Sequence, residues 1–170
     1  MTIQNQIERA RKAFEQISDY TQEQVDKLVY EGAKIIYENA KPLAKMAVEE
    51  TRLGDYESKI GKNEGTAAAF WDYLKDKKSV GIINEDPSIG LIEAAHPIGV
   101  IGCITPATNP TVTPLGNFMH AVKCKNAVII SPAPRAEKTS TTTVNLIREA
   151  LAKNGAPEGL IQIVNDVTIE

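Results

Sequence analysis

The chain has 170 residues, of which 42% are hydrophobic and 24% are charged, and its formal net charge at pH 7 is −3. This length suits one domain, and this composition is that of an ordinary globular protein. The weakly acidic charge offers no general attraction to phosphate backbones or anionic lipids, which argues against nucleic-acid and membrane partners.

The N-terminal residues lead directly into a helical pattern without the apolar core of a signal peptide, and no apolar run is long enough to span a membrane. The two cysteines, Cys103 and Cys124, have neither a disulfide-framework spacing nor a Cys-x-x-Cys spacing, which points to a reducing compartment. We therefore expect a cytoplasmic protein.

Residues 1–78 predict a helical segment, because apolar side chains recur there at helical intervals. In the first helix, the residues that share one face are Ile3, Ile7, Phe14 and Ile17. Thr21 and Gln24 have the spacing of a capping box, so we expect a second helix to begin there.

Two further helices are expected before residue 78. Pro42 suits the first turn of the third helix, which Gly54 would end. The fourth helix extends from about residue 57 to 77, and its Phe70 and Trp71 are expected to pack against other helices rather than to stack on a ligand.

After Lys78 the pattern changes to β-branched runs separated by proline and glycine. Residues 80–83 and 89–94 predict a strand pair. Three short apolar runs follow, of the kind that is buried on both faces, and they cover residues 100–104, 127–130 and 160–164.

Helices are expected between these runs, at residues 113–122 and 139–153. The threonine-rich residues 139–143 would cap the second of these helices, and Gly155 would end it. Strand, helix, strand, helix, strand with short connections predicts an α/β fold in which N-terminal helices precede half of a Rossmann-like parallel sheet. A sheet of three strands would leave the last strand as an unpaired apolar edge.

In open parallel sheets, ligands bind beyond the carboxyl ends of the strands. Residues 105–111, 131–135 and 165–166 follow the three apolar runs and would share that rim. The first segment provides hydroxyl groups and a carboxamide that could polarise a carbonyl or hold an oxyanion, and the second provides Ser131 and Arg135 for ribose or phosphate. The alternative is that both are proline-stiffened turns, since no glycine-rich dinucleotide fingerprint is present in the sequence.

Three blocks of sequence carry a specific resemblance. They are AAHPIGVIGCITPATNPT (94–111), KNAVIISPAPRA (125–136) and GAPEGLI (155–161). In order and spacing they closely resemble the CoA-acylating branch of the aldehyde dehydrogenase superfamily, and the resemblance covers essentially the whole chain. It implies NAD or NADP as hydride acceptor, CoA as acyl acceptor, and a small aldehyde as substrate, with a cysteine thiolate that forms the intermediate thioester.

The family's nucleophilic cysteine and its glycine-containing cofactor turn lie beyond Glu170. The resemblance therefore implies a truncated aldehyde dehydrogenase fold that lacks the catalytic domain and is inactive by itself. It divides the chain into a helical segment (1–78), a strand pair resembling the family's oligomerisation segment (79–97) and the leading half of the NAD(P)-binding domain (98–170). The full-length enzyme is expected to be a homo-oligomer.

The resemblance also implies roles for individual residues. Aligning the family's proline-flanked oxyanion turn puts Thr108 at its asparagine, with Asn109 one residue later, and Asn109 is preferred because its NH2 is a fixed donor. The cofactor-binding residues would be Ile104, Thr105, Pro106, Ala107, Ser131, Pro132, Pro134 and Arg135. Ser131 and Pro134 replace the family's ribose-binding lysine and glutamate. Arg135 would then bind an NADP 2′-phosphate or a CoA phosphate, or else be a solvated charge at the start of a helix.

Other reactive residue types favour structural interpretations. Cys103 lies in an apolar strand, and Cys124, although a lowered pKa between two lysines is conceivable, has no base beside it. His96 and His120 have no second ligand at metal spacing, so no metal site is expected. The alternative to an enzyme is a stand-alone nucleotide-binding or oligomerisation module without catalysis.

Overall fold

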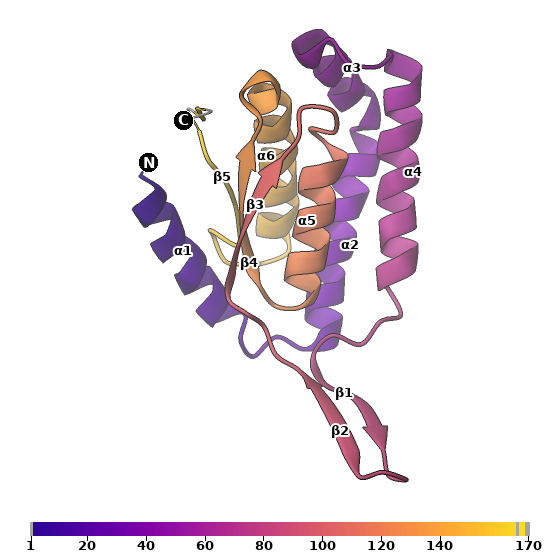
Figure 1. Ribbon diagram of the computed structural model, residues 1–170, viewed down its shortest axis with the longest axis vertical. Helices are drawn as coiled ribbons and strands as arrows, with labels where there is room; N and C mark the ends of the chain where they lie inside the picture. Colours follow the sequence, from indigo (N-terminus) through magenta and orange to yellow (C-terminus); the bar gives the residue numbers. More distant parts are fainter. Residues whose placement is uncertain (1, 166, 169–170) are drawn as a thin grey trace.

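The computed structural model describes residues 2–165 and 167–168, and it places a parallel sheet between layers of helices (Figure 1). In chain order the elements are α1 (Ile3–Gln16), α2 (Gln22–Glu38), α3 (Ala40–Thr51), α4 (Tyr56–Leu74), β1 (Gly81–Asp86), β2 (Leu91–Ala95), β3 (Val100–Thr105), α5 (Val112–Lys123), β4 (Ala127–Pro132), the short 3-10 turn η1 (Pro134–Ala136), α6 (Glu137–Lys153) and β5 (Ile161–Ile163). Helix α1 lies on one side of the sheet; α5 and α6 lie on the other, against α2, α3 and α4. This α/β arrangement confirms the predicted fold class.

The predicted capping box at the start of α2 is confirmed. The Thr21 side chain accepts a bond from the Gln24 backbone, and the Gln24 side chain accepts one from the Thr21 backbone. Pro42 lies in the first turn of α3 as expected. The predicted end of α3 at Gly54 is wrong, because the helix ends at Thr51 and Arg52 is the residue in the left-handed conformation that follows it.

The apolar stripe predicted for α1 is only partly buried. Gln6, Ala10 and Ala13 are buried, whereas Ile3 is 54% exposed. The small side chains of two alanines allow the helix to approach the sheet closely. Of the stripe, Ile7 and Phe14 are half-buried and line a cleft beside β3, while Ile17 is fully buried.

The three strands β3, β4 and β5 are parallel and adjacent in that order, as predicted. Strand β4 lies in the middle, and all of its residues except the half-buried Ser131 are buried. The expectation that all three strands are buried on both faces is wrong for β3, in which Gly102 is exposed and Ile104 is 90% exposed. The face of β3 that carries Gly102 and Ile104 is therefore open to solvent.

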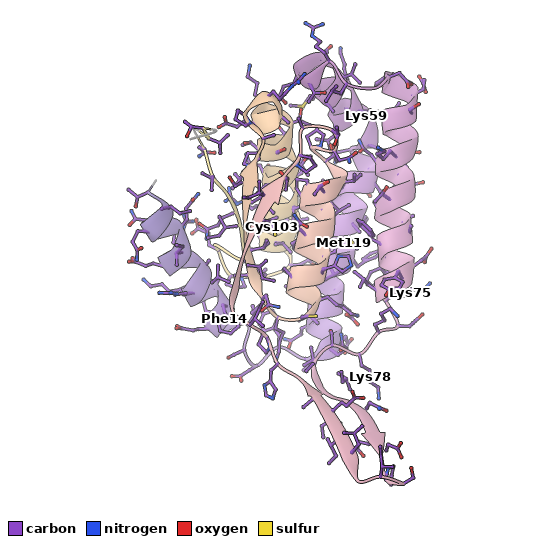
Figure 2. The ribbon with its side chains drawn as sticks, in the orientation of Figure 1. Phe14, Lys59, Lys75, Lys78, Cys103 and Met119 are labelled. Atoms are coloured by element: carbon purple, nitrogen blue, oxygen red, sulfur yellow. The ribbon has the colours of Figure 1, made fainter. Side chains whose placement is uncertain are left out.

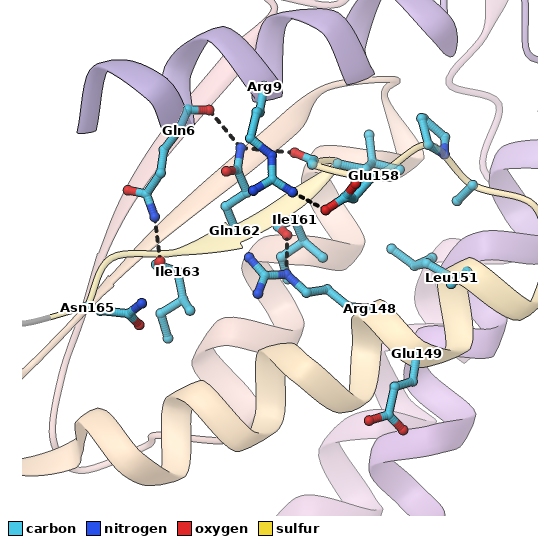
Figure 3. Close-up of a pocket in the computed structure, with 15 residues that line it drawn as sticks. Gln6, Arg9, Arg148, Glu149, Leu151, Glu158, Ile161, Gln162, Ile163 and Asn165 are labelled. Atoms are coloured by element: carbon cyan, nitrogen blue, oxygen red, sulfur yellow. Dashed lines mark hydrogen bonds and ion pairs between the residues drawn. The ribbon is translucent and has the colours of Figure 1, made fainter. Parts of the chain in front are cut away.

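The last strand, β5, is an edge of the sheet with no strand of the described residues on its outer side, as predicted, but it is not open to solvent. Its three residues are all buried. Because β5 bonds to β4 through Leu160 O and Val164 N, the carbonyls of Ile161 and Ile163 point outward. Arg148 Nε donates to Ile161 O at 2.9 Å and Gln6 Nε2 donates to Ile163 O at 2.7 Å (Figure 3). Side chains thus protect the β5 edge.

Close helix packing holds the outer layer to the sheet. A methyl group at Gly32 of α2 would lie 2.2 Å from the ring of Phe118, and one at Gly116 of α5 would lie 2.7 Å from Phe70. Both glycines are therefore needed where aromatic rings meet helix backbones. Trp71 packs on Tyr30 with ring centroids 5.1 Å apart, which confirms the packing interpretation of the Phe70–Trp71 pair.

The predicted strand pair is the antiparallel hairpin β1–β2, which projects away from the helices (Figure 1). Its apolar side chains are open to solvent, with Ile82 52% and Ile92 64% exposed. No helix within the described residues is long and apolar enough to cross a membrane.

Candidate functional site

The carboxyl ends of β3 and β4 form one rim. Ile104 is the register partner of Ser131, and Thr105 is the partner of Pro132. The segments 105–111 and 131–135 therefore lie next to each other, as predicted for a parallel sheet. Of the third expected segment, Asp166 lies outside the described residues, and Asn165 lines a cavity beside β5 (Figure 3).

The segment after β3 presents only some of its polar groups to the outside. Thr108 is exposed and Asn109 half-buried, while Pro106 is exposed and Ala107 half-buried. Thr105 and Thr111 are each 2% exposed, and their hydroxyls have no hydrogen-bond partner among the described residues. Only the middle of this segment can therefore reach a ligand in solution.

Two lysines of α4 bind the exposed part of this segment. Lys59 Nζ donates to Thr108 O at 2.5 Å, and Lys62 Nζ donates to Asn109 Oδ1 at 2.9 Å. Figure 2 shows Lys59 at the end of the molecule where the segment turns. Burial, and to a smaller extent the positive charge of Lys62, lowers the pKa of Lys59. The sequence analysis missed both lysines; their helical spacing of three residues was the available signal.

The bond from Lys62 determines which atoms Asn109 presents. Because Oδ1 accepts from Lys62, the NH2 group lies on the other side of the amide. Its remaining intramolecular contact is a long one, 3.4 Å to Thr108 Oγ1. Asn109 thus retains a donor that can reach a ligand oxygen, which supports it over Thr108 as the oxyanion donor.

In the segment after β4, the charged side chain is Arg135, and it bonds to another part of the fold. Ser131 is half-buried, Pro132 is buried at the end of β4, and Pro134 belongs to η1. Arg135 Nη2 donates to Thr51 O at the end of α3, at 2.7 Å. This contact favours a structural role for Arg135 over a phosphate-binding role.

The N-terminus of α6 is capped by another helix, so the prediction that the threonine-rich residues 139–143 form the cap is wrong. Residue Ala136 precedes the helix and has no side chain that can accept a bond. The Glu50 carboxylate of α3 instead accepts bonds from Lys138 N and Thr139 N, both at 2.8 Å, and from Thr139 Oγ1 at 2.6 Å. A carboxylate therefore already occupies the position where this helix would bind an anion.

A cleft of about 990 Å³ lies beside the rim, between α1 and the strands β3 and β4. Ile104 and Ser131 line it, together with the apolar stripe of α1 that includes Ile7 and Phe14. This apolar surface with a nearby hydroxyl suits an adenosine group. In the segment after β4, Arg135 is exposed, but one of its guanidinium nitrogens already bonds to Thr51, so the residues present fit the nucleoside part of a cofactor better than its phosphates.

Local surroundings describe the two cysteines and His120. Burial raises the pKa of Cys103. Cys124 is exposed, but partial burial raises its pKa more than the charge of Lys123 lowers it, which argues against an activated thiol. His120 Nδ1 lies 2.7 Å from Gly116 O, and no group of three possible metal ligands occurs within residues 2–165 and 167–168.

Comparisons with known proteins match this chain to one family. The model of the aldehyde dehydrogenase family matches residues 1–169. The succinate-semialdehyde dehydrogenase (acetylating) of Clostridium kluyveri is 48% identical over 164 residues, which cover 96% of this chain and 36% of that protein. The chain thus spans little more than a third of the length of this curated relative.

Comparison with solved structures points to the same family. An acetylating aldehyde dehydrogenase from Geobacillus thermoglucosidasius has a TM-score of 0.94 at 38% identity, covering 98% of this chain and 37% of the other. An engineered glycolyl-CoA reductase with bound NADP+ has a TM-score of 0.82 at 31% identity, covering 99% and 38%. The match to the family model, the sequence identity and the shared fold together show that the chain belongs to the aldehyde dehydrogenase family.

Proposed function

We propose that this chain is the cofactor-binding front portion of an enzyme that converts a small aldehyde to its acyl-CoA with NAD or NADP and CoA. The observation that carries the proposal is the common rim of β3 and β4, on which Asn109 and Ser131 follow neighbouring strands. The acylating relative from C. kluyveri and the CoA-reductase neighbour with NADP+ support this reaction class. The cysteine that carries the acyl group as a thioester is supplied by the portion of the enzyme outside this chain.

Most of the predicted rim residues have a role in this proposal. Asn109 donates a hydrogen bond to the oxygen on which negative charge develops when the cysteine adds to the aldehyde. Ile104 packs against the adenine, while Ser131 bonds to the ribose, and Pro106, Ala107, Pro132 and Pro134 shape the backbone around them. The bound nicotinamide supplies the hydride acceptor. The cleft lining supports these assignments.

Other features of the full-length enzyme stay predictions. They are the choice between NAD and NADP, the identity of the aldehyde, a cytoplasmic location, homo-oligomerisation, and the division at residues 78 and 97. Inactivity of the isolated chain is also a prediction; the raised pKa values of Cys103 and Cys124 support it, because a thiol with a raised pKa is a poor nucleophile at neutral pH.

The test is an assay of the complete enzyme, meaning the natural polypeptide with the portion that supplies the cysteine. We expect acyl-CoA and reduced nicotinamide to form in equal amounts from a small aldehyde, and no product from residues 1–170 alone. Acyl-CoA formation by the isolated chain, lost on Cys124→Ala, would contradict the assignment of the nucleophile.

A second candidate function is an oligomerisation module, which the exposed hairpin β1–β2 favours. Ile82 and Ile92 leave apolar surface on a projecting hairpin, as interfaces between subunits often do. If oligomerisation is the function of this chain, residues 1–170 alone form stable oligomers that Ile92→Lys dissociates. Light scattering at several concentrations would measure this.

A further inference from the structure

Helix α4 directs two ammonium groups at two successive residues of the rim. Lys59 bonds to the Thr108 carbonyl, and Lys62, one turn later, bonds to the Asn109 side chain. The sequence separations are 49 and 47 residues, so only the folded arrangement of α4 against this segment brings them together. Neither lysine is part of the cofactor-binding or oxyanion assignments above.

The burial of Lys59 is unusual for a lysine. It is 7% exposed, and the hydrogen bond that the structure gives its ammonium group ends on a neutral carbonyl instead of a carboxylate. Lysines are rarely buried this deeply without an opposite charge, because removing an ammonium from water costs free energy. A methionine of similar length would fill the site without that cost. Stability of the fold alone therefore does not explain why a lysine occupies this buried position.

The two bonds restrict different motions of the rim. The Lys59 bond holds the peptide between Thr108 and Asn109, which fixes the backbone position of Asn109. The Lys62 bond fixes the amide orientation, since a turn of the amide by half a revolution would direct Oδ1 toward the ligand and repel an oxyanion. Together they leave the Asn109 NH2 as the group presented outward.

We propose that Lys59 and Lys62 are positioning residues that hold Asn109 as an oxyanion donor, with Lys59 fixing its backbone and Lys62 its amide. This inference rests on the proposed function. Lys59 does not touch the substrate in this account; it acts through the Thr108 carbonyl. Lys62 acts through Asn109 Oδ1.

The test compares Lys59→Met, Lys62→Met and Lys62→Arg in the complete enzyme, with Lys45→Met as control. Lys45 is an exposed lysine on α3 that only approaches Glu49, at 3.9 Å. We expect Lys62→Met and Lys59→Met each to lower kcat about tenfold, less than loss of the donor itself, while KM for NAD(P) changes less than about twofold. Lys62→Arg should retain most of the activity, because its guanidinium can still donate to Oδ1.

Two further measurements separate positioning from a merely structural role. Lys59→Met should leave the Tm unchanged or raise it, whereas loss of a structural contact would lower it. In NMR spectra of residues 1–170, Lys62→Met should shift or broaden the side-chain NH2 signals of Asn109, and Lys45→Met should not.

The outcomes distinguish this inference from the proposed function. A complete enzyme that makes no acyl-CoA, or one in which Asn109→Ala is fully active, rejects the proposed function. If Asn109→Ala lowers kcat but Lys59→Met and Lys62→Met keep the wild-type kcat, only the positioning role is rejected. A Lys59→Met variant whose lost activity follows a lowered Tm also rejects it for Lys59, and the exposed Lys62 then provides the remaining test.

Discussion

The two segments at the rim differ in how the fold uses their polar groups. In residues 105–111, bonds from Lys59 and Lys62 hold carbonyl oxygens and leave the Asn109 NH2 available. In residues 131–135 and the helix that follows, the charged and amide groups bond to α3, where Arg135 donates to Thr51 and Glu50 caps α6. The first segment therefore presents a hydrogen-bond donor, the NH2 group of Asn109. The second segment bonds to neighbouring helices, and it leaves Ser131 and the other N–H groups of Arg135 for a ligand.

The largest expected effect separates the two residues first considered for the oxyanion. In the complete enzyme, Asn109→Ala should lower kcat by about 100-fold or more, because loss of one oxyanion donor typically has that effect. Thr108→Ala should lower kcat less than about threefold, since its backbone carbonyl, which binds Lys59, is kept. Steady-state kinetics measures both, and the reverse ranking would assign the role to Thr108.

The next largest effect concerns stability. Glu50→Ala removes three bonds at the start of α6, and we expect the free energy of unfolding of residues 1–170 to fall by about 1–2 kcal/mol. The matched control is Glu49→Ala, which removes only a distant exposed ion pair with Lys45. Urea unfolding measures the two. Equal effects would contradict the capping role of Glu50.

Arg135 provides a smaller and more selective test. If it serves the fold, Arg135→Ala should change KM for NADP less than about twofold and lower the free energy of unfolding by about 1 kcal/mol, the usual value of one hydrogen bond. A KM for NADP that rises tenfold while KM for NAD stays constant would instead identify Arg135 as the 2′-phosphate ligand.

The smallest effect is a titration. Lys62→Met should raise the pKa of Lys59, because it removes the neighbouring positive charge, while burial keeps that pKa below its usual value. In the wild-type chain the unfolded state binds more protons than the folded state between the lowered pKa and the ordinary lysine value. The contribution of Lys59 to the free energy of unfolding therefore rises as the pH increases through that window. The Lys59→Met substitution should abolish this rise. NMR titration of the lysine ammonium group gives the pKa directly; no change on Lys62→Met would contradict the electrostatic coupling.

Local patterns were enough to predict much of the architecture. Thr21 and Gln24 signal the start of α2 because a capping box involves only neighbouring residues. The apolar runs and their order were enough to place Ile104 beside Ser131, since parallel strands share one direction. The site segments could therefore be located, although their assigned roles stay predictions.

Contacts between residues far apart in the sequence could not be predicted. Glu50 caps a helix that begins 87 residues later, and the threonine-rich residues that were expected to cap it lie inside that helix. Gln6 bonds to the outer edge of β5 across 157 residues, a contact that the sequence pattern did not indicate. Lys59 and Lys62 had no role in the sequence analysis, because their partners lie 49 and 47 residues away. In each case a polar side chain finds its partner only after the helices have packed.

The most direct test of the rim as the cofactor site is a crystal structure of the complete enzyme with NADP bound. The account predicts that the adenosine lies in the cleft between α1 and β3, against Ile104 and Ser131, with Asn109 Nδ2 directed toward the aldehyde position. Nucleotide bound instead in the cavity beside β5, between Arg9 and Arg148 (Figure 3), would contradict it.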